Sequence, residues 1–461
     1  MKQYIITLII AFIAGCSFTP KLEINTPPVP DKIDNVTGVV GEVDINTEWW
    51  KIFNDEKLNK IVDEVIQNNR DIKSATLRVS LALANLGIED ANLYPSVNIN
   101  AGVSRSSVSK EVSPYREMIL NNYNIGASVS YEIDFWGKLR AQKGVAVSQY
   151  NASIYDKQTL MISVVSSAVN IYFNIVTLKK QIDVMDKYIS MYEETYNYRK
   201  KQYENGLISD YTLKQTEVQL LNAKAQVVSM KQSLEQLKSS LSLLAGRNPK
   251  DIFEKDISTT NELMVEVRLP IISSKALLER PDIKAAIERV KSSNFNIGTA
   301  KALYYPNISL TGSLGFASNE LGNLAQSSAN FWSLGSVIYF PLLDFGRIKN
   351  SVKKSEISLD IAINEYEKVV QNAFKEVYDI LNSIRFLNEK KEVKLKEIKN
   401  LEEVLAISKR YYDVGRISIF EVLENDRYLL NRKMEMISIE NDILNSYVNL
   451  YKALGGFNNS N

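Results

Sequence analysis

The sequence predicts a membrane β-barrel continued by a long α-helical coiled-coil barrel, internally duplicated and completed by three copies of the chain. Three observations predict this fold class. A set of motifs returns after about 210 residues, each copy carries a pair of alternating apolar and polar strands, and each pair is followed by a helix of unusual length. A trimer would then supply a barrel of twelve strands and a helical tunnel of twelve helices.

The internal duplication is the most informative feature of the chain. Between residues 71 and 95, eleven positions are identical to those 211 residues further on, where chance would give on the order of one or two. The identical residues of the first copy are Asp71-Ile72-Lys73, Ala75, Arg78-Val79, Asn85, Gly87, Ala91 and Tyr94-Pro95. A second block returns after 209 residues, and it consists of Tyr203, Gly206, Ile208-Ser209 and Gly246. A period this long indicates two large, similar halves rather than a solenoid.

The duplication and the two ends of the chain set the predicted boundaries. Each half is expected to consist of a helix, a β-hairpin, a long helix and a shorter helix. The predicted segments are a signal peptide at 1–15, a lipidated N-terminal segment at 16–68, a first repeat at 69–246, a linker at 247–278, a second repeat at 279–456 and a C-terminal tail at 457–461.

A predicted β-hairpin follows the first helix of each half. That helix ends at Pro95 or at Pro306, because proline cannot continue a regular helix. From Tyr123 to Phe135 the odd positions are apolar or aromatic, apart from Ala127, and the even positions are polar or glycine. Such strands suit a membrane barrel with a wet interior, and half-buried hairpins of a soluble domain are the alternative. The predicted strands are 97–104, 123–135, 308–317 and 332–342, joined by polar stretches at 105–122 and 318–330.

A very long helix follows each hairpin, since no proline or glycine interrupts residues 145–205 or 347–414. At 1.5 Å per residue, about 65 residues extend about 100 Å. Glycine turns at Gly206 and Gly415 then send the chain back along shorter helices, about 210–245 and 419–454. Apolar residues recur in steps of four and three, which we interpret as a coiled-coil seam and not as a cofactor site. The seam residues are Val164, Ala168, Ile171, Ile175, Leu178, Ile182, Met185, Ile189, Tyr192 and Tyr196, then Val370, Phe374, Val377, Leu381 and Ile384.

The N-terminus predicts a secretory signal that ends in a lipid anchor. Lys2 supplies a positive charge, residues 4–14 are apolar, and Ile13-Ala14-Gly15-Cys16 resembles a lipobox. We therefore predict that Cys16 is acylated, with an ordinary signal peptide and an incidental cysteine as the alternative. Ser17 in place of aspartate resembles lipoproteins that are transferred to the outer membrane. The rest of the sequence suggests no other apolar run long enough to span a membrane as a helix, so strands would cross it.

The composition excludes most enzyme chemistry. The chain has no histidine and one cysteine, which removes histidine acid–base catalysis, Ser-His and Cys-His nucleophile pairs, and His/Cys zinc sites. We expect no catalytic residue, no metal and no cofactor. The positive charges of 55 Lys and Arg residues nearly cancel the negative charges of 54 Asp and Glu residues, so nucleic acid is a poor partner. A secreted hydrolase would need a positioned nucleophile or carboxylate pair, and the sequence suggests none.

Closure of the barrel requires more than one chain. Four strands cannot close, and an open edge in lipid leaves unpaired amides that each cost several kcal/mol. Three copies would give twelve strands, whose helices would continue as a hollow cylinder. A lipid-anchored tube of this kind is a conduit. A rod-like adhesin or scaffold lipoprotein would explain the coiled coils, but it would not explain two amphipathic strand pairs.

Four motifs, in order along essentially the whole mature chain, resemble the outer-membrane factor (TolC/OprM-like) family. They are Trp49-Trp50 to Leu58, Tyr131 to Arg140, Pro341 to Arg347, and Val448 to Gly456. The resemblance is closest to the lipoprotein branch that serves tripartite drug pumps. It implies a homotrimer in the outer membrane of a Gram-negative bacterium, extending into the periplasm. It also implies a periplasmic adaptor and an inner-membrane transporter, for which we expect proton drive while ATP drive stays open. The duct of a type I protein secretion system is the alternative.

The resemblance further implies a periplasmic aperture near the second helix turn. Aligned through Gly415, the family's acidic pair falls on Glu421 and Glu424, and its closing tyrosine falls on Tyr412. Six carboxylates in a trimer would favour cations, whereas ordinary solvated helix residues are the alternative. Ile417 and Thr212 replace the locking arginine and its acidic partner, although Asp210 is nearby, which leaves the form of the lock open. The strand–helix junctions are assigned to Pro95, Pro306, Gly137 and Gly346.

Overall fold

A computed structural model describes residues 17–24, 27, 40–41, 48–109, 111, 118–248, 269–270 and 277–456. The predicted signal peptide, Cys16 and the C-terminal tail lie outside the described residues. The chain divides into two compact units. Unit 1 consists of Met1–Thr26, Arg78–Ile154 and Ala285–Glu367, and unit 2 consists of Pro27–Leu77, Tyr155–Lys284 and Lys368–Asn461. Each unit therefore combines segments from both halves of the sequence duplication.

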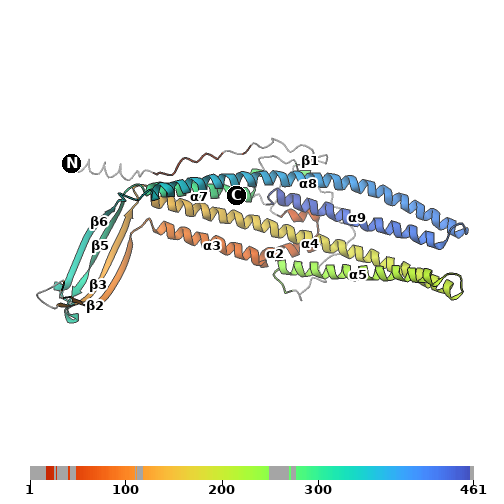
Figure 1. The fold of residues 1–461 in the computed structure, drawn as a ribbon, viewed down its shortest axis with the longest axis horizontal. Coiled ribbons are helices and arrows are strands. Elements are labelled where there is room, and N and C mark those ends of the chain that lie inside the picture. Colours follow the sequence, from red (N-terminus) through yellow and green to blue (C-terminus); the bar gives the residue numbers. More distant parts are fainter. Residues whose placement is uncertain are drawn as a thin grey trace. The chain divides into compact units, whose positions relative to one another are not determined.

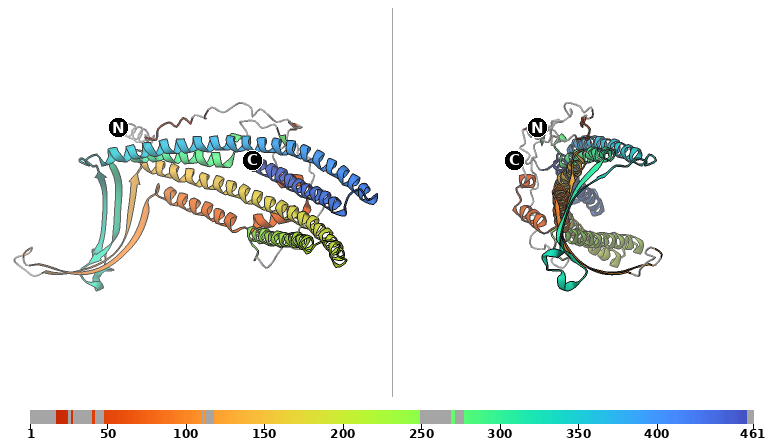
Figure 2. Two further views of the ribbon diagram at one scale, coloured as in Figure 1. Left: turned by 45° about the vertical axis from the view of Figure 1, so that its right-hand side comes forward. Right: turned by 90° about the vertical axis from the view of Figure 1, so that its left-hand side faces the viewer.

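Unit 1 contains a four-stranded antiparallel sheet in the order β2-β3-β5-β6 (Figure 1). Each half of the duplication supplies one hairpin, and the β3–β5 pairing joins the two hairpins. Figure 2 shows that this sheet is strongly curved. The four predicted strands are confirmed, with the bounds β2 (Ser96–Val108), β3 (Met118–Ile133), β5 (Asn307–Ser318) and β6 (Asn330–Tyr339).

The strand ends differ from the prediction. Residues 105–108 and 118–122 belong to β2 and β3, although the stretch 105–122 was predicted to be a polar connection. Arg105 pairs with Asn121 and Val108 with Met118, because backbone ladder bonds continue whatever the side chains are. β3 ends at Ile133 and not at residue 135, and β6 ends at Tyr339 and not at residue 342. The polar stretch at 318–330 contains two short 3-10 turns, η2 (Leu321–Asn323) and η3 (Ser327–Ala329).

The two faces of the sheet differ in polarity, and the register shows this row by row. One row across the four strands holds Asn98, Ser128, Ser313 and Ser333. The adjacent row, on the opposite face, holds Ile99, Ala127, Leu314 and Trp332. Ser313 and Ser333 lie within hydrogen-bonding distance, 2.7 Å, on the polar face. On the apolar face Ile99 is 81% and Trp332 76% exposed in a single chain, so this face has no cover from the described part of the protein.

Helices precede and follow the strands of the sheet and make up most of both units. α3 (Arg70–Ala91) precedes the first hairpin and α7 (Pro281–Ala302) the second. The predicted long helices are confirmed as α4 (Lys138–Glu204) and α8 (Arg347–Asp413), of 67 residues each. The shorter return helices are α5 (Asp210–Leu244) and α9 (Ile419–Ala453). α4 begins before the predicted residue 145 and runs through Gly144, whose missing Cβ leaves room for the ring of Phe295.

The core of unit 2 joins the segment before the first repeat to the last helix of the chain. η1 (Trp49–Phe53) and α2 (Glu56–Asn68) pack against α4, and Trp49 also stacks on Tyr451 of α9. A short parallel pairing joins β1 (Val40–Gly41) to β4 (Leu269–Pro270). Seam residues of α4 that are fully or nearly fully buried in this core include Val164, Ala168, Ile175 and Ile182. The heptad pattern therefore marks helix packing, as predicted.

The prediction that the rest of the chain has no apolar run long enough to span a membrane as a helix was wrong. α4 contains an 18-residue window of mean hydropathy 1.6, which is long and apolar enough to cross a membrane by length and composition. Over half of that window is buried inside the protein, so its apolar character is accounted for by packing. Sequence hydropathy does not separate a buried core helix from a spanning one.

A row of amides runs through the contact between α4 and α9. Asn174 accepts hydrogen bonds at Oδ1 from the Nδ2 atoms of Asn441 (2.7 Å) and Asn445 (3.0 Å). Asn170 donates to Asn449 over 3.2 Å. We call these five residues the asparagine ladder. The row is partly buried at Asn174, Asn441 and Asn445 and exposed at Asn449. Such a row favours one axial register of the packed helices, because a shifted register would leave the amides unpaired.

Candidate functional site

The strand–helix junctions of unit 1 are built around two aspartates. Asp134 caps α4 by accepting from the backbone N–H groups of Leu139 (2.9 Å) and Arg140 (3.0 Å). Asp344 caps α8 in the same way, with Ile348 at 2.7 Å and Gly346 at 3.0 Å. These backbone hydrogen bonds, from Ile348 first, hold the pKa of Asp344 below its usual value. Both helices are thereby fixed at the rim of the sheet.

The predicted junction residues lie at these rims. Gly137 and Gly346 have left-handed φ angles of 72° and 86° immediately before α4 and α8. Pro95 and Pro306 stand directly before β2 and β5. The carbonyl of Pro306 accepts a hydrogen bond from the indole of Trp136 over 2.8 Å, which links the β3–α4 junction to the connection between α7 and β5.

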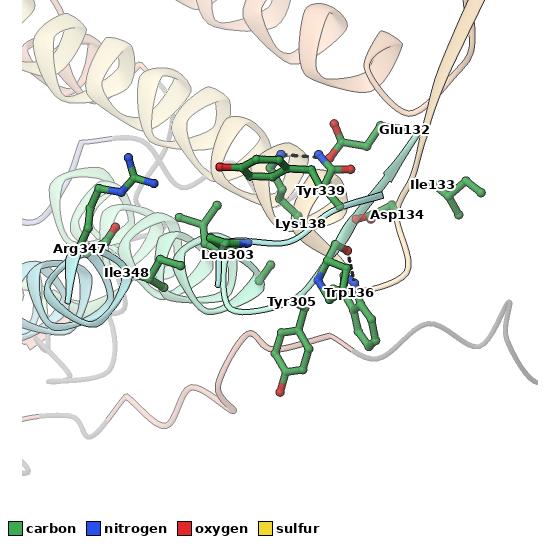
Figure 3. A pocket seen from close by; sticks show the side chains of 15 residues that line it. Glu132, Ile133, Asp134, Trp136, Lys138, Leu303, Tyr305, Tyr339, Arg347 and Ile348 are labelled. Carbon is green, nitrogen blue, oxygen red and sulfur yellow. Dashed lines mark hydrogen bonds and ion pairs between the residues drawn. The ribbon is translucent and has the colours of Figure 1, made fainter. Parts of the chain in front are cut away.

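A cavity of about 400 Å³ lies at this rim (Figure 3). Its lining combines aromatic side chains, Trp136, Tyr305 and Tyr339, with the charged groups of Lys138 and Arg347. Lys138 is already paired with Glu132, over 3.0 Å. Among the described residues there is no cluster of three or more His, Cys, Asp or Glu side chains able to hold a metal ion.

The helix turns of unit 2 repeat one local design. Gly206 has φ 71° and Gly415 has φ 72°, a left-handed conformation that favours glycine. In each turn the residue after the glycine donates back to the carbonyl five positions earlier, Leu207 to Gln202 and Arg416 to Tyr411, both over 2.8 Å. This pattern satisfies the last carbonyls of α4 and α8. Ser209 and Ser418 then cap the returning helices α5 and α9.

The three predicted aperture residues lie beside the second turn in different environments. Tyr412 is 39% exposed, near the end of α8. Glu421 is exposed and forms a capping box with Ser418 at the start of α9. Glu424 is partly buried, and its carboxylate pairs with Arg427 over 2.6 Å. Between the two glutamates, Val422 is buried against Leu405 and Leu429 in the α8–α9 contact. The structure therefore distinguishes a solvent-facing carboxylate at 421 from a neutralised one at 424.

Sequence reasoning missed a cluster in which α4 holds α9. The phenol of Tyr188 donates to the main-chain carbonyl of Arg427. The side chain of Arg427 also contacts the phenol of Tyr192, and it forms the ion pair with Glu424. We call Tyr188, Tyr192, Glu424 and Arg427 the tyrosine–arginine cluster. A second contact between α4 and α9 lies nearby, with Arg199 5.3 Å from the ring centre of Phe420.

The electrostatics of this cluster keep both tyrosines protonated. Burial raises the pKa of Tyr188, and the neighbouring Tyr192 raises it further, while Arg427 opposes the shift. Burial also raises the pKa of Tyr192, again opposed by Arg427. Tyr188 therefore remains a hydrogen-bond donor at physiological pH. The available sequence signal was a pair of tyrosines four residues apart together with a Glu–Arg pair three residues apart on the returning helix.

Both edge strands of the sheet lack a partner within the described chain. β2 pairs only with β3, and β6 only with β5. Every residue of β6 is exposed. Unpaired edges next to an exposed apolar face are a ready surface for strands of another chain.

The chain matches the model of the outer membrane efflux protein family over residues 61–247 and 272–456. It is similar to the probable outer membrane lipoprotein SilC of Salmonella typhimurium, with 29% identity over 452 residues and 97% of each chain covered. It is also similar to the toluene efflux pump outer membrane protein TtgF of Pseudomonas putida, with 28% identity over 471 residues, 99% of this chain and 97% of the relative.

Among solved structures, the fold is similar to that of the CmeC outer membrane channel of Campylobacter jejuni. The TM-score is 0.90 and the identity 29%, with 97% of this chain and 96% of that chain covered. The predicted resemblance to outer-membrane factors, the internally duplicated channel fold and the outer-membrane location are confirmed. The chain therefore belongs to the outer membrane efflux protein family, as an outer-membrane channel that serves efflux.

Proposed function

We propose that three copies of the chain form one twelve-stranded barrel, continued into the periplasm by a helical tunnel that serves as a passive duct. The observation that supports this proposal is the sheet itself. Four strands with two free edges, one exposed apolar face and one polar face are complete only when other copies pair with β2 and β6. The apolar face would then meet lipid, and the polar face would line the channel.

The proposed duct works with a periplasmic adaptor and an inner-membrane transporter, expected to be proton-driven, that supplies the energy. The cargo is proposed to be drugs or other small molecules. The similarity to TtgF, whose name is that of a toluene efflux pump protein, supports this class of cargo. A shared duct selects by width and charge, so the transporter would choose the cargo.

Three further assignments belong to this proposal. Cys16 carries the lipid anchor, which the similarity to the lipoprotein SilC supports. The two repeats extend over 69–246 and 279–456, and each contains most of one span matched by the family model. Tyr412, Glu421 and Glu424 line the periplasmic aperture, which the capped turn at Gly415 supports by placing them at one end of α8 and α9.

Conductance in a planar lipid bilayer tests the proposal directly. The purified full-length protein should run as a trimer in mass photometry and should give discrete, cation-preferring conductance steps. A rod-like scaffold of the same composition would give none. Monomeric protein without conductance, obtained from correctly lipidated outer-membrane material, would contradict the duct.

A further inference from the structure

The segment after Cys16 is held on unit 1 by an aromatic stack. The ring of Phe18 lies parallel to that of Tyr305, with centroids 4.5 Å apart and an interplanar angle of 11°. Tyr305 in turn stacks on Trp136, at 4.8 Å and 29°. These rings come from three places in the chain: the N-terminal segment, the end of α7 and the β3–α4 junction. Stacked pairs of this kind stabilise a contact beyond the apolar area that they bury.

α7 adds two contacts that fit the same segment. Asn294, which is 5% exposed, donates from Nδ2 to the carbonyl of Pro20 over 2.9 Å. A Cβ at Gly298 would lie 2.3 Å from Oγ1 of Thr19 and 3.0 Å from its backbone nitrogen. Only a residue without a side chain leaves room for the segment at that point. Residues 18, 19 and 20 therefore each have a specific partner.

The first half of the duplication lacks this site. Gly87 is the counterpart of Gly298, and a Cβ there would meet no atom within 4 Å. Leu83 stands where the second half has Asn294, and Tyr94, the counterpart of Tyr305, is 66% exposed. The site is thus a feature of α7 and its neighbours alone, and not a general property of the repeated helix.

The site is connected to the β3–α4 junction and to the connection between α7 and β5. The indole nitrogen of Trp136 donates to the carbonyl of Pro306 over 2.8 Å, immediately before β5. Trp136 and Tyr305 stand at one edge of the cavity at the rim of the sheet, as Figure 3 shows. Tryptophan and tyrosine at such a rim are the side chains that favour a membrane–water interface.

We propose that Phe18, Thr19 and Pro20 form a docking strap, which holds the lipid anchor of Cys16 beside the strand–helix junctions. Phe18 lies two positions after Cys16 in the sequence, a reach of about 7 Å. The acyl chains would therefore enter the membrane next to the point where the strands enter it. The strap would fix the position of the lipid anchor relative to the sheet of unit 1. It would thereby raise the effective concentration of correctly placed sheets for trimer assembly. This inference rests on the proposed acylation and on the proposed trimer.

Photo-crosslinking tests the docking itself. Benzoylphenylalanine in place of Phe18 should crosslink, in isolated outer membranes, to the peptide that contains Tyr305 or Trp136. The intact mass of the same protein reports acylation of Cys16 separately. Crosslinks to other peptides, or none, would overturn the docking even if acylation is normal. An unacylated Cys16 with normal crosslinks would instead overturn the lipid-anchor function of the strap, together with the proposed acylation.

Substitutions test the positioning role. Phe18→Ala should leave acylation unchanged and lower the yield of heat-resistant trimers about fivefold, the factor that corresponds to roughly 1 kcal/mol of lost stacking. Phe18→Tyr should restore the yield, because it restores the ring. Lys21→Ala is the matched control, since its side chain is 88% exposed and pairs with Glu23 in the same segment.

A second pair of variants acts from the other side of the contact. Gly298→Ala should reduce the trimer yield as Phe18→Ala does, although alanine favours the helix more than glycine. Gly87→Ala, at the equivalent open position, should not. If Phe18→Ala and Gly298→Ala both assemble like wild type, the strap has no positioning role.

Discussion

The phenol of Tyr188, on the first long helix, donates a hydrogen bond to the main-chain carbonyl of Arg427, on the last helix. The two residues lie 239 positions apart, one in each half of the duplication. Arg427 also engages Tyr192 and Glu424 through its side chain. The positions expected to form a lock, Thr212 and Ile417, cannot form a salt bridge. The tyrosine–arginine cluster therefore offers a different means of holding α9 to α4 within one chain.

Tyr188→Phe tests this cluster. The variant should keep its fold, because it removes a single hydrogen bond worth about 0.5–1.5 kcal/mol. The contact between α4 and α9 would be weaker, so single-channel recordings should show longer or more frequent open periods. Tyr211→Phe on α5 is the control, since Tyr211 is 71% exposed and its phenol only accepts from the nearby Gln215. Equal open probability for wild type and Tyr188→Phe would exclude a gating role for this contact.

Asn174→Leu tests the asparagine ladder. The substitution removes the acceptor of both Asn441 and Asn445 while adding apolar volume to the α4–α9 contact. Unpaired donors in this partly buried contact cost up to about 1–3 kcal/mol, so the midpoint of thermal unfolding should fall. Ser167→Ala, which removes only an exposed bond within α4, should leave the midpoint unchanged. An unchanged or higher midpoint for Asn174→Leu would show that the ladder does not stabilise the register.

The architecture could be predicted from the sequence because its main elements have local signatures. Alternation between Tyr123 and Phe135 predicted β3, and the absence of proline and glycine predicted α4 and α8. The helix turns at Gly206 and Gly415 were predicted because only a residue tolerant of positive φ fits there. The internal duplication then predicted the corresponding elements in the second half of the chain.

The contacts between distant segments could not be predicted in this way. A heptad pattern shows which face of α4 is apolar, but it does not show which helix covers that face or which polar groups meet there. Tyr192 was assigned to the apolar seam, although its phenol contacts Arg427. Asn294 meets Pro20 across 274 positions, and no periodicity relates the two. Such contacts depend on tertiary packing, which a single sequence does not encode as a visible pattern.

Arginine substitutions on β3 test the orientation of the sheet. Val129 lies in a row with Val97, Gly312 and Leu334 on the apolar face. Val129→Arg should therefore cost about 2–4 kcal/mol if that face meets lipid near mid-depth. Ser128→Arg, on the polar face, should be much milder. The yield of heat-modifiable barrel after folding into vesicles measures both, and equal tolerance would contradict the assignment of the faces.

An acid-sensitive charge network joins α8 to α9. Lys394 contacts Glu397 (2.7 Å) and Glu435 (2.8 Å), and Arg432 contacts Glu397 (2.7 Å). The hydrogen bond from Lys394 is the main cause that holds the pKa of Glu435 below its ordinary value of 4.5. A depressed pKa means that the stabilisation is fully present above the unfolded value and is lost as the pH falls through the folded value.

Glu435→Gln should consequently flatten the dependence of the unfolding midpoint on pH below about 4.5 and lower the midpoint at neutral pH. Thermal melts between pH 3 and pH 7 measure both effects. Glu403→Gln is a control of the same chemical type at an exposed position of α8. Identical pH profiles of the unfolding midpoint for wild type and Glu435→Gln would show that this network does not contribute to the loss of stability in acid.

The charge at the start of α9 should control ion selectivity if this region lines the proposed aperture. Glu421 is exposed, whereas Glu424 and Arg427 form a pair that carries no net charge. Glu421→Gln should therefore weaken the cation preference, measured as the reversal potential in a salt gradient, and should reduce block by multivalent cations. Glu424→Gln should shift selectivity in the same direction, because it leaves Arg427 unpaired, and it should also alter channel opening by breaking the cluster.

The double variant Glu424→Gln/Arg427→Gln separates these two effects. It keeps the net charge of the wild type, so its selectivity should return close to the wild-type value while its opening stays altered. Arg427→Gln alone should strengthen the cation preference, since both carboxylates then act without compensation. This order follows from charge alone and does not depend on how wide the aperture is. If Glu421→Gln leaves the reversal potential unchanged, the carboxylate at 421 faces away from the ion path, and another ring of residues must set the selectivity.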